Sequence, residues 1–115
     1  MFELTVEKSF SGAHQLIKSN SPCENLHGHN WRVALTIRGE KQEPEVGWVL
    51  DFKRLKSALN KELEKFDHKY LNDVLQISPT AENIAKQIYQ DLSGALPVCR
   101  VTVWETDKAS VSYYE

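Results

Sequence analysis

Several classes of protein are excluded by what this chain of 115 residues has little of. It contains two cysteines, four prolines and five glycines, too few for a disulfide-stabilised scaffold or a collagen-like or low-complexity chain. The longest apolar runs are only a few residues, so we expect no segment that spans a membrane. The 14 basic and 16 acidic residues form no basic block or stripe, and we therefore expect no nucleic-acid partner.

The cysteines and the first residues of the chain bear on the compartment. The start, Met1–Val6, has strand-like alternation and no charged-then-apolar signal pattern, so we expect a cytoplasmic protein. In that reducing compartment Cys23 and Cys99 are expected to be free thiols. Cys23 lies in a polar loop and is the candidate for chemistry, whereas Cys99 is expected in the core.

The overall composition of the chain is typical of one globular domain over residues 1–115. Hydrophobic residues make up 41% of the chain and charged residues 26%. A chain of this size buries roughly two-thirds of its unfolded surface, which is enough for a single core.

Hydrophobic periodicity predicts the order of the elements. Alternation predicts strands over 2–14, 27–38 and 98–105, a short strand at 48–50, and a last strand at Val111 and Tyr113. Two apolar stripes predict helices, with Asp51 and Thr80 as N-caps, residues 69–79 as the connector and Gly94 as the stop. The first stripe consists of Phe52, Leu55, Leu59, Leu63 and Phe66.

The resulting order, β-β-α-α-β-β, predicts an α+β domain with a four-stranded antiparallel sheet and two helices on one face. Such a sheet has two open edges. Because open edges promote association, we expect them to be paired across subunits.

Three of the four histidines fall on the apolar side of the two long predicted strands. His27 and His29 are two residues apart, so their side chains point to the same side of a strand, and His14 lies at the end of the neighbouring strand. Three neutral imidazoles that converge on one ion are typical of a zinc site, and Gly28 leaves room for a ligand. We therefore predict zinc bound by His14, His27 and His29. The alternative is three ordinary histidines with hydrogen-bond partners.

Cys23, four residues before His27, leaves two possibilities for the fourth coordination position. If its thiolate binds the zinc, the site is structural. If it does not, one position stays open for a substrate and the site is catalytic. We favour the catalytic site, because the loop before His27 is short and Cys23 would have to fold back onto the ion.

Six segments, taken together in order and spacing, resemble the 6-pyruvoyl-tetrahydropterin synthase family over nearly the whole chain. They are Phe10-Ser11-Gly12-Ala13-His14, Cys23-x-x-Leu26-His27-Gly28-His29-Asn30-Trp31, Gly47-x-x-x-Asp51-Phe52, Asp67-His68-x-x-Leu71-Asn72, Pro79-Thr80-Ala81-Glu82-Asn83 and Glu105-Thr106. The short gap between Cys23 and His27 is most similar to the branch of the family that makes 6-carboxytetrahydropterin for queuosine.

The resemblance implies a tunnelling fold, in which three subunits join their sheets into a barrel and two trimers stack into a homohexamer with sites at subunit interfaces. It implies 7,8-dihydroneopterin triphosphate as the substrate and 6-carboxy-5,6,7,8-tetrahydropterin as the product, with release of triphosphate and acetaldehyde. The expected protein is therefore a zinc-dependent lyase of queuosine (7-deazaguanine) biosynthesis.

The resemblance also implies roles for residues other than the zinc ligands. Cys23 would be a general base, and Asp67 and His68 would form a proton relay that meets Cys23 across a subunit boundary. Glu105 would bind the N3–H and 2-amino donors of the pterin ring, and Thr80 would contact the same ring. From the residues alone, His68 could equally be a histidine at a helix C-terminus, Glu105 an exposed strand end and Thr80 only an N-cap.

Three positions depart from the family pattern. Gln15 stands where the family often has an arginine after the first zinc histidine. If that arginine helps to hold the triphosphate, another base must do so in this protein. Phe66 in place of leucine and Gly12 in place of alanine are tolerable changes. Two other functions stay open: a 6-pyruvoyl-tetrahydropterin synthase or folate-pathway relative of the same fold, and a non-catalytic zinc-binding module.

Overall fold

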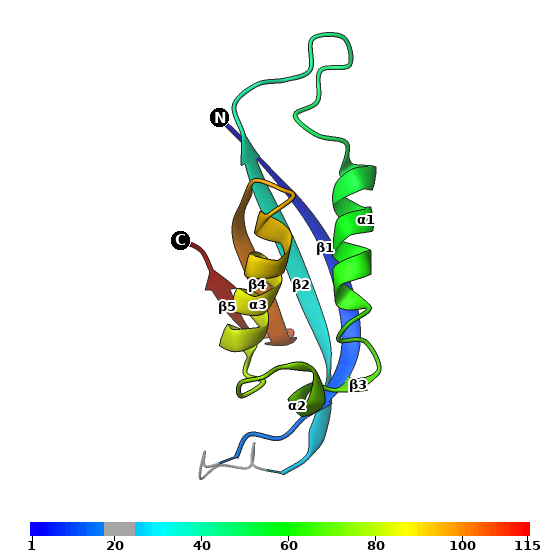
Figure 1. Ribbon diagram of the computed structural model, residues 1–115, viewed down its shortest axis with the longest axis vertical. Coiled ribbons are helices and arrows are strands. Elements are labelled where there is room, and N and C mark those ends of the chain that lie inside the picture. Colours follow the sequence, from blue (N-terminus) through cyan, green and yellow to red (C-terminus); the bar gives the residue numbers. More distant parts are fainter. Residues whose placement is uncertain (18–24) are drawn as a thin grey trace.

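Two long antiparallel strands form the centre of the structure, a computed structural model that describes residues 1–17 and 25–115. β1 (Phe2–His14) pairs with β2 (His27–Gly39) so that Phe2 lies opposite Gly39 and His14 opposite His27. β4 (Val98–Thr106) pairs with β2, and β5 (Ala109–Tyr113) pairs with β4. These are the four predicted antiparallel strands, and the chain is elongated along them to 54 Å (Figure 1).

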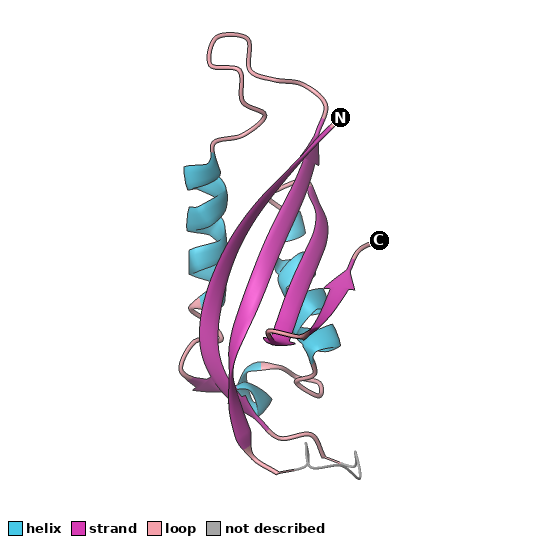
Figure 2. Cartoon of the chain, turned by 180° about the vertical axis from the view of Figure 1, so that it is seen from behind, coloured by secondary structure: helices cyan, strands magenta, loops and turns pink. Residues whose placement is uncertain are grey.

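The two predicted helices lie on one face of this sheet. α1 (Phe52–Leu63) and α3 (Ala81–Ser93) pack side by side over it, while the opposite face is not covered by a helix, as Figure 2 shows from behind. The predicted α+β class is therefore confirmed. Within the described residues no helix is long and apolar enough to cross a membrane.

Both helices begin at the predicted capping residues. The Asp51 carboxylate accepts a hydrogen bond from the Lys53 backbone N–H at 2.9 Å, and the Thr80 hydroxyl accepts one from the Asn83 backbone N–H at 3.2 Å. Each cap satisfies a backbone donor that has no partner inside the helix and contributes about 1 kcal/mol.

The core fills the space between the helices and the sheet. Phe10 stacks on Trp31 with ring centroids 6.0 Å apart, and Phe66 packs against Phe10 at 5.7 Å. Burial of each such side chain contributes roughly 1.5–3 kcal/mol. The fully buried apolar residues include Trp31, Val33, Leu35, Ile37, Leu55, Leu71, Ile84, Ile88, Val101 and Val103.

The predicted connector contains two short elements that periodicity did not indicate. β3 (Lys69–Tyr70) pairs in parallel with Gly12 and Ala13, and α2 (Leu71–Val74) follows it directly. The sheet therefore has five strands, in the order β3-β1-β2-β4-β5. A strand of two residues and a helix of four are too short to produce a periodic signal.

The predicted strand at residues 48–50 is wrong. The chain forms a hydrogen-bonded turn there. The Glu43 N–H donates to the Trp48 carbonyl at 2.7 Å, and the Gly47 N–H donates to the Glu43 carbonyl at 2.8 Å. Gly47 has φ +94°, a conformation that glycine adopts without steric cost. The turn directs this segment away from any sheet partner among the described residues.

The predicted stripe of α1 is wrong at both ends. Phe52, at the first turn, is 53% exposed, and the helix ends at Leu63, before Phe66. Phe66 is nevertheless buried, in the turns after the helix. Apolar spacing alone did not distinguish a longer helix from a helix followed by a buried turn.

The expected core position of Cys99 is also wrong. The pairing of β2 with β4 shifts between Thr36 and Ile37, so that Arg100 faces Thr36 and Val98 faces Ile37. Cys99 lies between these two residues, and it is half-buried. The irregularity ends the simple alternation of side chains on which the prediction relied.

A buried carboxyl group joins α1 to α3. Glu62 is only 4% exposed, and its Oε1 lies 2.8 Å from Nζ of Lys65, which is 3.4 Å from Oδ2 of Asp91. Burial, reinforced by the neighbouring Asp91 carboxyl and opposed by Lys65, raises the pKa of Glu62 to about 7.

This carboxyl makes the stability of the protein depend on pH. The ordinary pKa of a glutamate is about 4.3, so the folded protein binds a proton more readily than the unfolded chain. The contribution is complete below about pH 4.3 and is lost as the pH rises through about 7. We expect it to be on the order of 2 kcal/mol, and expect Glu62→Gln, which cannot ionise, to flatten this pH dependence.

Urea unfolding of both proteins at about pH 5 and about pH 8 measures the effect. The exposed neighbour Glu64→Gln is the matched control and should keep the wild-type difference between the two pH values. Equal pH dependence in Glu62→Gln and the wild type would contradict the assignment.

Candidate metal centre

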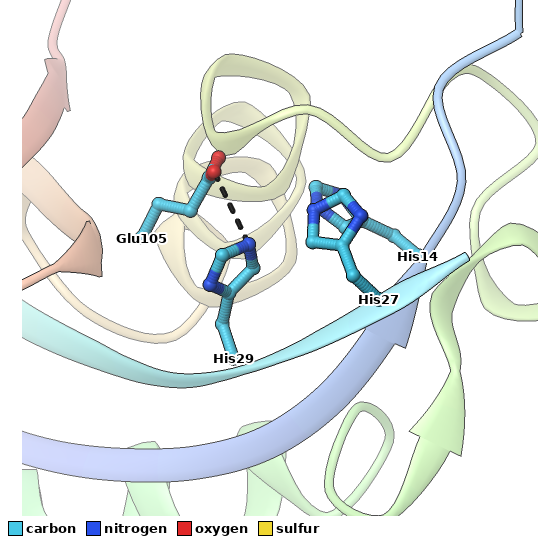
Figure 3. Close-up of side chains that lie close together, drawn as sticks. All are labelled: His14, His27, His29 and Glu105. Atoms are coloured by element: carbon cyan, nitrogen blue, oxygen red, sulfur yellow. Dashed lines mark hydrogen bonds and ion pairs between the residues drawn. The ribbon is translucent and has the colours of Figure 1, made fainter. Parts of the chain in front are cut away.

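The register of β1 and β2 brings the three predicted histidine ligands together. His14, the last residue of β1, faces His27, the first residue of β2, and Gly12 faces His29. All three side chains point to the helix-covered side of the sheet, where Glu105 joins them from β4 (Figure 3). Their four possible ligand atoms lie within 4.8 Å of one another.

Backbone carbonyl groups fix the tautomers of two of these imidazoles. Nδ1 of His14 is 2.8 Å from the Pro79 carbonyl oxygen, and Nδ1 of His27 is 2.7 Å from that of Asn25. A carbonyl group only accepts, so each Nδ1 carries the hydrogen and each neutral ring has its lone pair on Nε2. The two Nε2 atoms are 2.9 Å apart. Two lone pairs at this distance repel one another unless a proton or a metal cation lies between them.

The third imidazole presents a buried nitrogen to the same point. Nε2 of His29 lies 3.2 Å from Oε1 of Glu105, but the angles do not suit a hydrogen bond, and this atom has no other hydrogen-bond partner among the described residues. Burial lowers the pKa of His29, and Glu105, which acts in the opposite direction, offsets this only in part. The neutral ring that results is the form that binds a metal ion.

The donor set and its surroundings fit a metal ion. Three imidazole nitrogens and one carboxylate are ligands that suit zinc. Trp31 packs edge-on against His14 and His29, with ring centroids 5.0 Å and 5.3 Å away, and its Nε1–H donates to the Gly12 carbonyl at 3.1 Å. His14 is fully buried, whereas Glu105 is 30% exposed. The group therefore has a buried inner side at His14 and a partly exposed outer side at Glu105.

Asn72 is a residue of this site that the sequence did not reveal. Its Oδ1 accepts from the Gln15 backbone N–H at 2.9 Å, and its Nδ2–H donates to the Gln15 carbonyl at 2.8 Å. This pair of hydrogen bonds fixes the chain immediately after His14, and Pro79 holds the ring of His14 itself. The only signal was the Leu71-Asn72 pair in a segment that we expected to be a plain connector.

Asp67 and His68 form a separate pair near the edge of the sheet. Oδ1 of Asp67 accepts from the Ser11 backbone N–H at 3.0 Å and lies 3.2 Å from Nδ1 of His68. These neighbours can contact one another directly because His68 is in a turn with φ +57° and not on a strand. His68 is 75% exposed and is not one of the four clustered residues.

The remaining predicted site residues are Thr80, Cys23 and Glu105. Thr80 caps α3, which agrees with its simpler interpretation, and its hydroxyl hydrogen is not used in that bond. Cys23 lies outside the described residues. Glu105 has the same parity as Val101 and Val103 and faces His29, so it can serve either as a metal ligand or as a ligand for a substrate at the open side.

Comparison with known proteins agrees with this fold. The family model described as 6-pyruvoyl tetrahydropterin synthase matches residues 3–115. A Synechocystis protein named 6-carboxy-5,6,7,8-tetrahydropterin synthase is 36% identical over 121 residues, covering 99% of this chain and 94% of its own. A Pyrococcus furiosus protein named dihydroneopterin monophosphate aldolase is 32% identical over 107 residues, covering 90% and 89%. The solved structure of Caenorhabditis elegans 6-pyruvoyl tetrahydropterin synthase matches with a TM-score of 0.84 at 28% identity, covering 100% of this chain and 97% of that one.

The sheet order, the helices on one face and the histidine group together define a tunnelling-fold domain of the pterin-synthase class. The chain belongs to the 6-pyruvoyl tetrahydropterin synthase family, as its motifs indicated.

Removal of one imidazole should release the metal ion. We expect His29→Ala to weaken zinc binding by more than about 100-fold. Removal of a residue that only hydrogen-bonds a metal ligand already lowers metal affinity by about 10- to 100-fold. Zinc per subunit, measured by elemental analysis after dialysis against a chelator, tests this.

Glu105→Gln is the matched control, since it keeps the shape of the side chain and removes its charge. If the three histidines suffice, this variant keeps its zinc. Loss of zinc from Glu105→Gln as complete as that from His29→Ala would show that the carboxylate is the fourth ligand and that the site is closed.

Proposed function

We propose that this protein is a zinc-dependent 6-carboxy-5,6,7,8-tetrahydropterin synthase of queuosine (7-deazaguanine) biosynthesis. It would convert 7,8-dihydroneopterin triphosphate to 6-carboxytetrahydropterin with release of triphosphate and acetaldehyde. The observation that carries this proposal is the group of three imidazoles that face one point beside a partly exposed carboxylate. The printed name of the Synechocystis relative supports this branch of the family.

The three histidines would hold the zinc ion on the inner side of the site. When bound there, zinc supplies positive charge that stabilises negative charge developing on the oxygens of the substrate side chain. The carbonyl groups of Pro79 and Asn25 keep the lone pairs of His14 and His27 directed at the ion. This fixed orientation is what a ligand needs to bind without first changing its tautomer.

Glu105 would hold the pterin ring at the outer side. A pterin presents N3–H and its 2-amino group side by side, and a carboxylate accepts from two such parallel donors. The carboxylate of Glu105 is next to His29 and is only partly exposed, so these hydrogen bonds would form in a site with limited access for water. Thr80 would add a contact through its free hydroxyl hydrogen.

The Asp67–His68 pair would exchange protons with the substrate. Asp67, held by the Ser11 backbone, orients Nδ1 of His68 and leaves its Nε2 available for general acid–base chemistry. Cys23 would act as the general base. Because His68 is next to β3, at one edge of the sheet, while Glu105 is next to β5, at the other, His68 of one subunit would serve the metal centre of its neighbour.

We also propose that the sheets of several subunits close into a barrel. The β3 and β5 edges are the two open edges of the sheet, and a barrel removes both by joining them between subunits. Three subunits per barrel and two stacked trimers would give the homohexamer expected for the family.

Product analysis tests the activity. The zinc-loaded protein, incubated with 7,8-dihydroneopterin triphosphate, should give a 6-carboxytetrahydropterin and acetaldehyde, identified by mass spectrometry. A 6-pyruvoyl product would instead assign the protein to the other branch of the family. No turnover, together with unfolding on chelation, would favour a zinc-stabilised binding module.

Mixed oligomers test whether each site uses two subunits. His29→Ala and His68→Ala should each abolish turnover, because each removes a different part of the site. Co-expression of the two variants in equal amounts should restore about a quarter of the wild-type rate, since each half of a shared interface is intact in about half of the random pairings. Absence of any recovery in oligomers shown to contain both variants would place the two residues in one subunit's site.

A further inference from the structure

A cavity of about 590 Å³ lies beside the metal centre, at the same end of the molecule. Its lining includes Ser11, Gly28, Asn30, His68, Lys69 and Tyr70, and it shares His29 with the histidine group. Ser11 and Asn30 belong to the strand positions that face away from the helices. Gly28 leaves this face open, because a Cβ there would approach no atom closer than the Gly12 carbonyl oxygen at 3.8 Å.

The polar groups of this cavity are mainly donors. Oγ of Ser11 donates to Oδ1 of Asn30 at 2.8 Å, and this bond directs the amide NH₂ of Asn30 away from Ser11. Lys69 is exposed and makes no ion pair with any described residue. An ammonium group, an amide NH₂, an imidazole and a phenol therefore surround one space, which suits an anion.

Acidic side chains do not line this cavity. Among the described residues none of its lining is aspartate or glutamate, although the chain as a whole has a formal charge of −2. The nearby Asp67 carboxylate is already bonded to the Ser11 N–H and placed against His68. The larger cavity of about 730 Å³ at the opposite end differs in this respect, because Glu40 and Glu115 accompany its basic residues.

We propose that the cavity beside His68 binds the phosphate chain of the substrate and that Lys69 is its principal cation. This inference rests on the proposed function. Gln15, which follows His14, carries no charge, so the phosphate groups need a cation from elsewhere in the site. Lys69 directly follows His68, so the residue that exchanges protons and the residue that binds phosphate would reach the neighbouring subunit's substrate together.

Binding of two unreactive pterins separates phosphate recognition from ring recognition. Neopterin triphosphate and neopterin, the oxidised fluorescent forms, share the ring and differ in the phosphate chain. With zinc-loaded protein we expect Lys69→Ala to weaken the binding of neopterin triphosphate by about tenfold, the loss typical of one charge-assisted hydrogen bond. The affinity for neopterin should not change. Equilibrium fluorescence titration measures both.

Two further variants complete the comparison. Lys69→Arg keeps the charge and should retain most of the affinity for neopterin triphosphate. Lys86→Ala removes an exposed lysine from α3, away from the cavity, and should change the affinity for neither pterin. An unchanged affinity of Lys69→Ala for neopterin triphosphate, or an equal loss for both pterins, overturns the proposal.

The result also distinguishes this proposal from the proposed function. If the wild type forms 6-carboxytetrahydropterin and Lys69→Ala binds neopterin triphosphate normally, only the phosphate site is wrong. If the wild type binds neither pterin and forms no product, the proposed function fails, and the phosphate site fails with it.

Discussion

Two nitrogen lone pairs held 2.9 Å apart, on Nε2 of His14 and Nε2 of His27, are the constraint on which this site depends. Each ring donates its Nδ1–H to a backbone carbonyl, so in the neutral form neither Nε2 has a hydrogen to offer the other. In water each lone pair would accept from the solvent, but His14 is fully buried. A cation at the point that both nitrogens face removes the repulsion, and His29 directs a third nitrogen toward the same region.

The rest of the fold holds these rings in place. The long β1–β2 ladder aligns His14 with His27, and Trp31, anchored to the Gly12 carbonyl, supports the rings from beneath. The segment after α1 is hydrogen-bonded to the end of β1 through the Ser11 backbone, the His14 ring and the Gln15 backbone. A metal centre at the end of a sheet would otherwise lie on a frayed strand, and these attachments prevent that.

The residues of the candidate site and of the adjacent cavity lie on both faces of the sheet. The histidine group and Glu105 lie on the helix-covered face, whereas Ser11 and Asn30 are at strand positions that face away from the helices. In the strand order, Glu105 on β4 is beside the β5 edge of the sheet, whereas His68 directly precedes β3 at the other edge. Under the proposed function, a neighbouring subunit would bring these two edges together in a closed oligomer.

The amino-acid sequence by itself determined the four main strands, the two helices, their caps and the common side of the three histidines. Each of these follows from local rules: a period of two along a strand, a period near 3.6 along a helix, and a capping side chain at a helix start. The tertiary structure alone decided that Asn72 clamps Gln15, that Pro79 fixes the tautomer of His14, that His68 turns back onto Asp67, and that Cys99 leaves the core. Most of these outcomes depend on where the chain returns after dozens of intervening residues, and pattern along the sequence carries no information about which backbone atom a distant segment will meet.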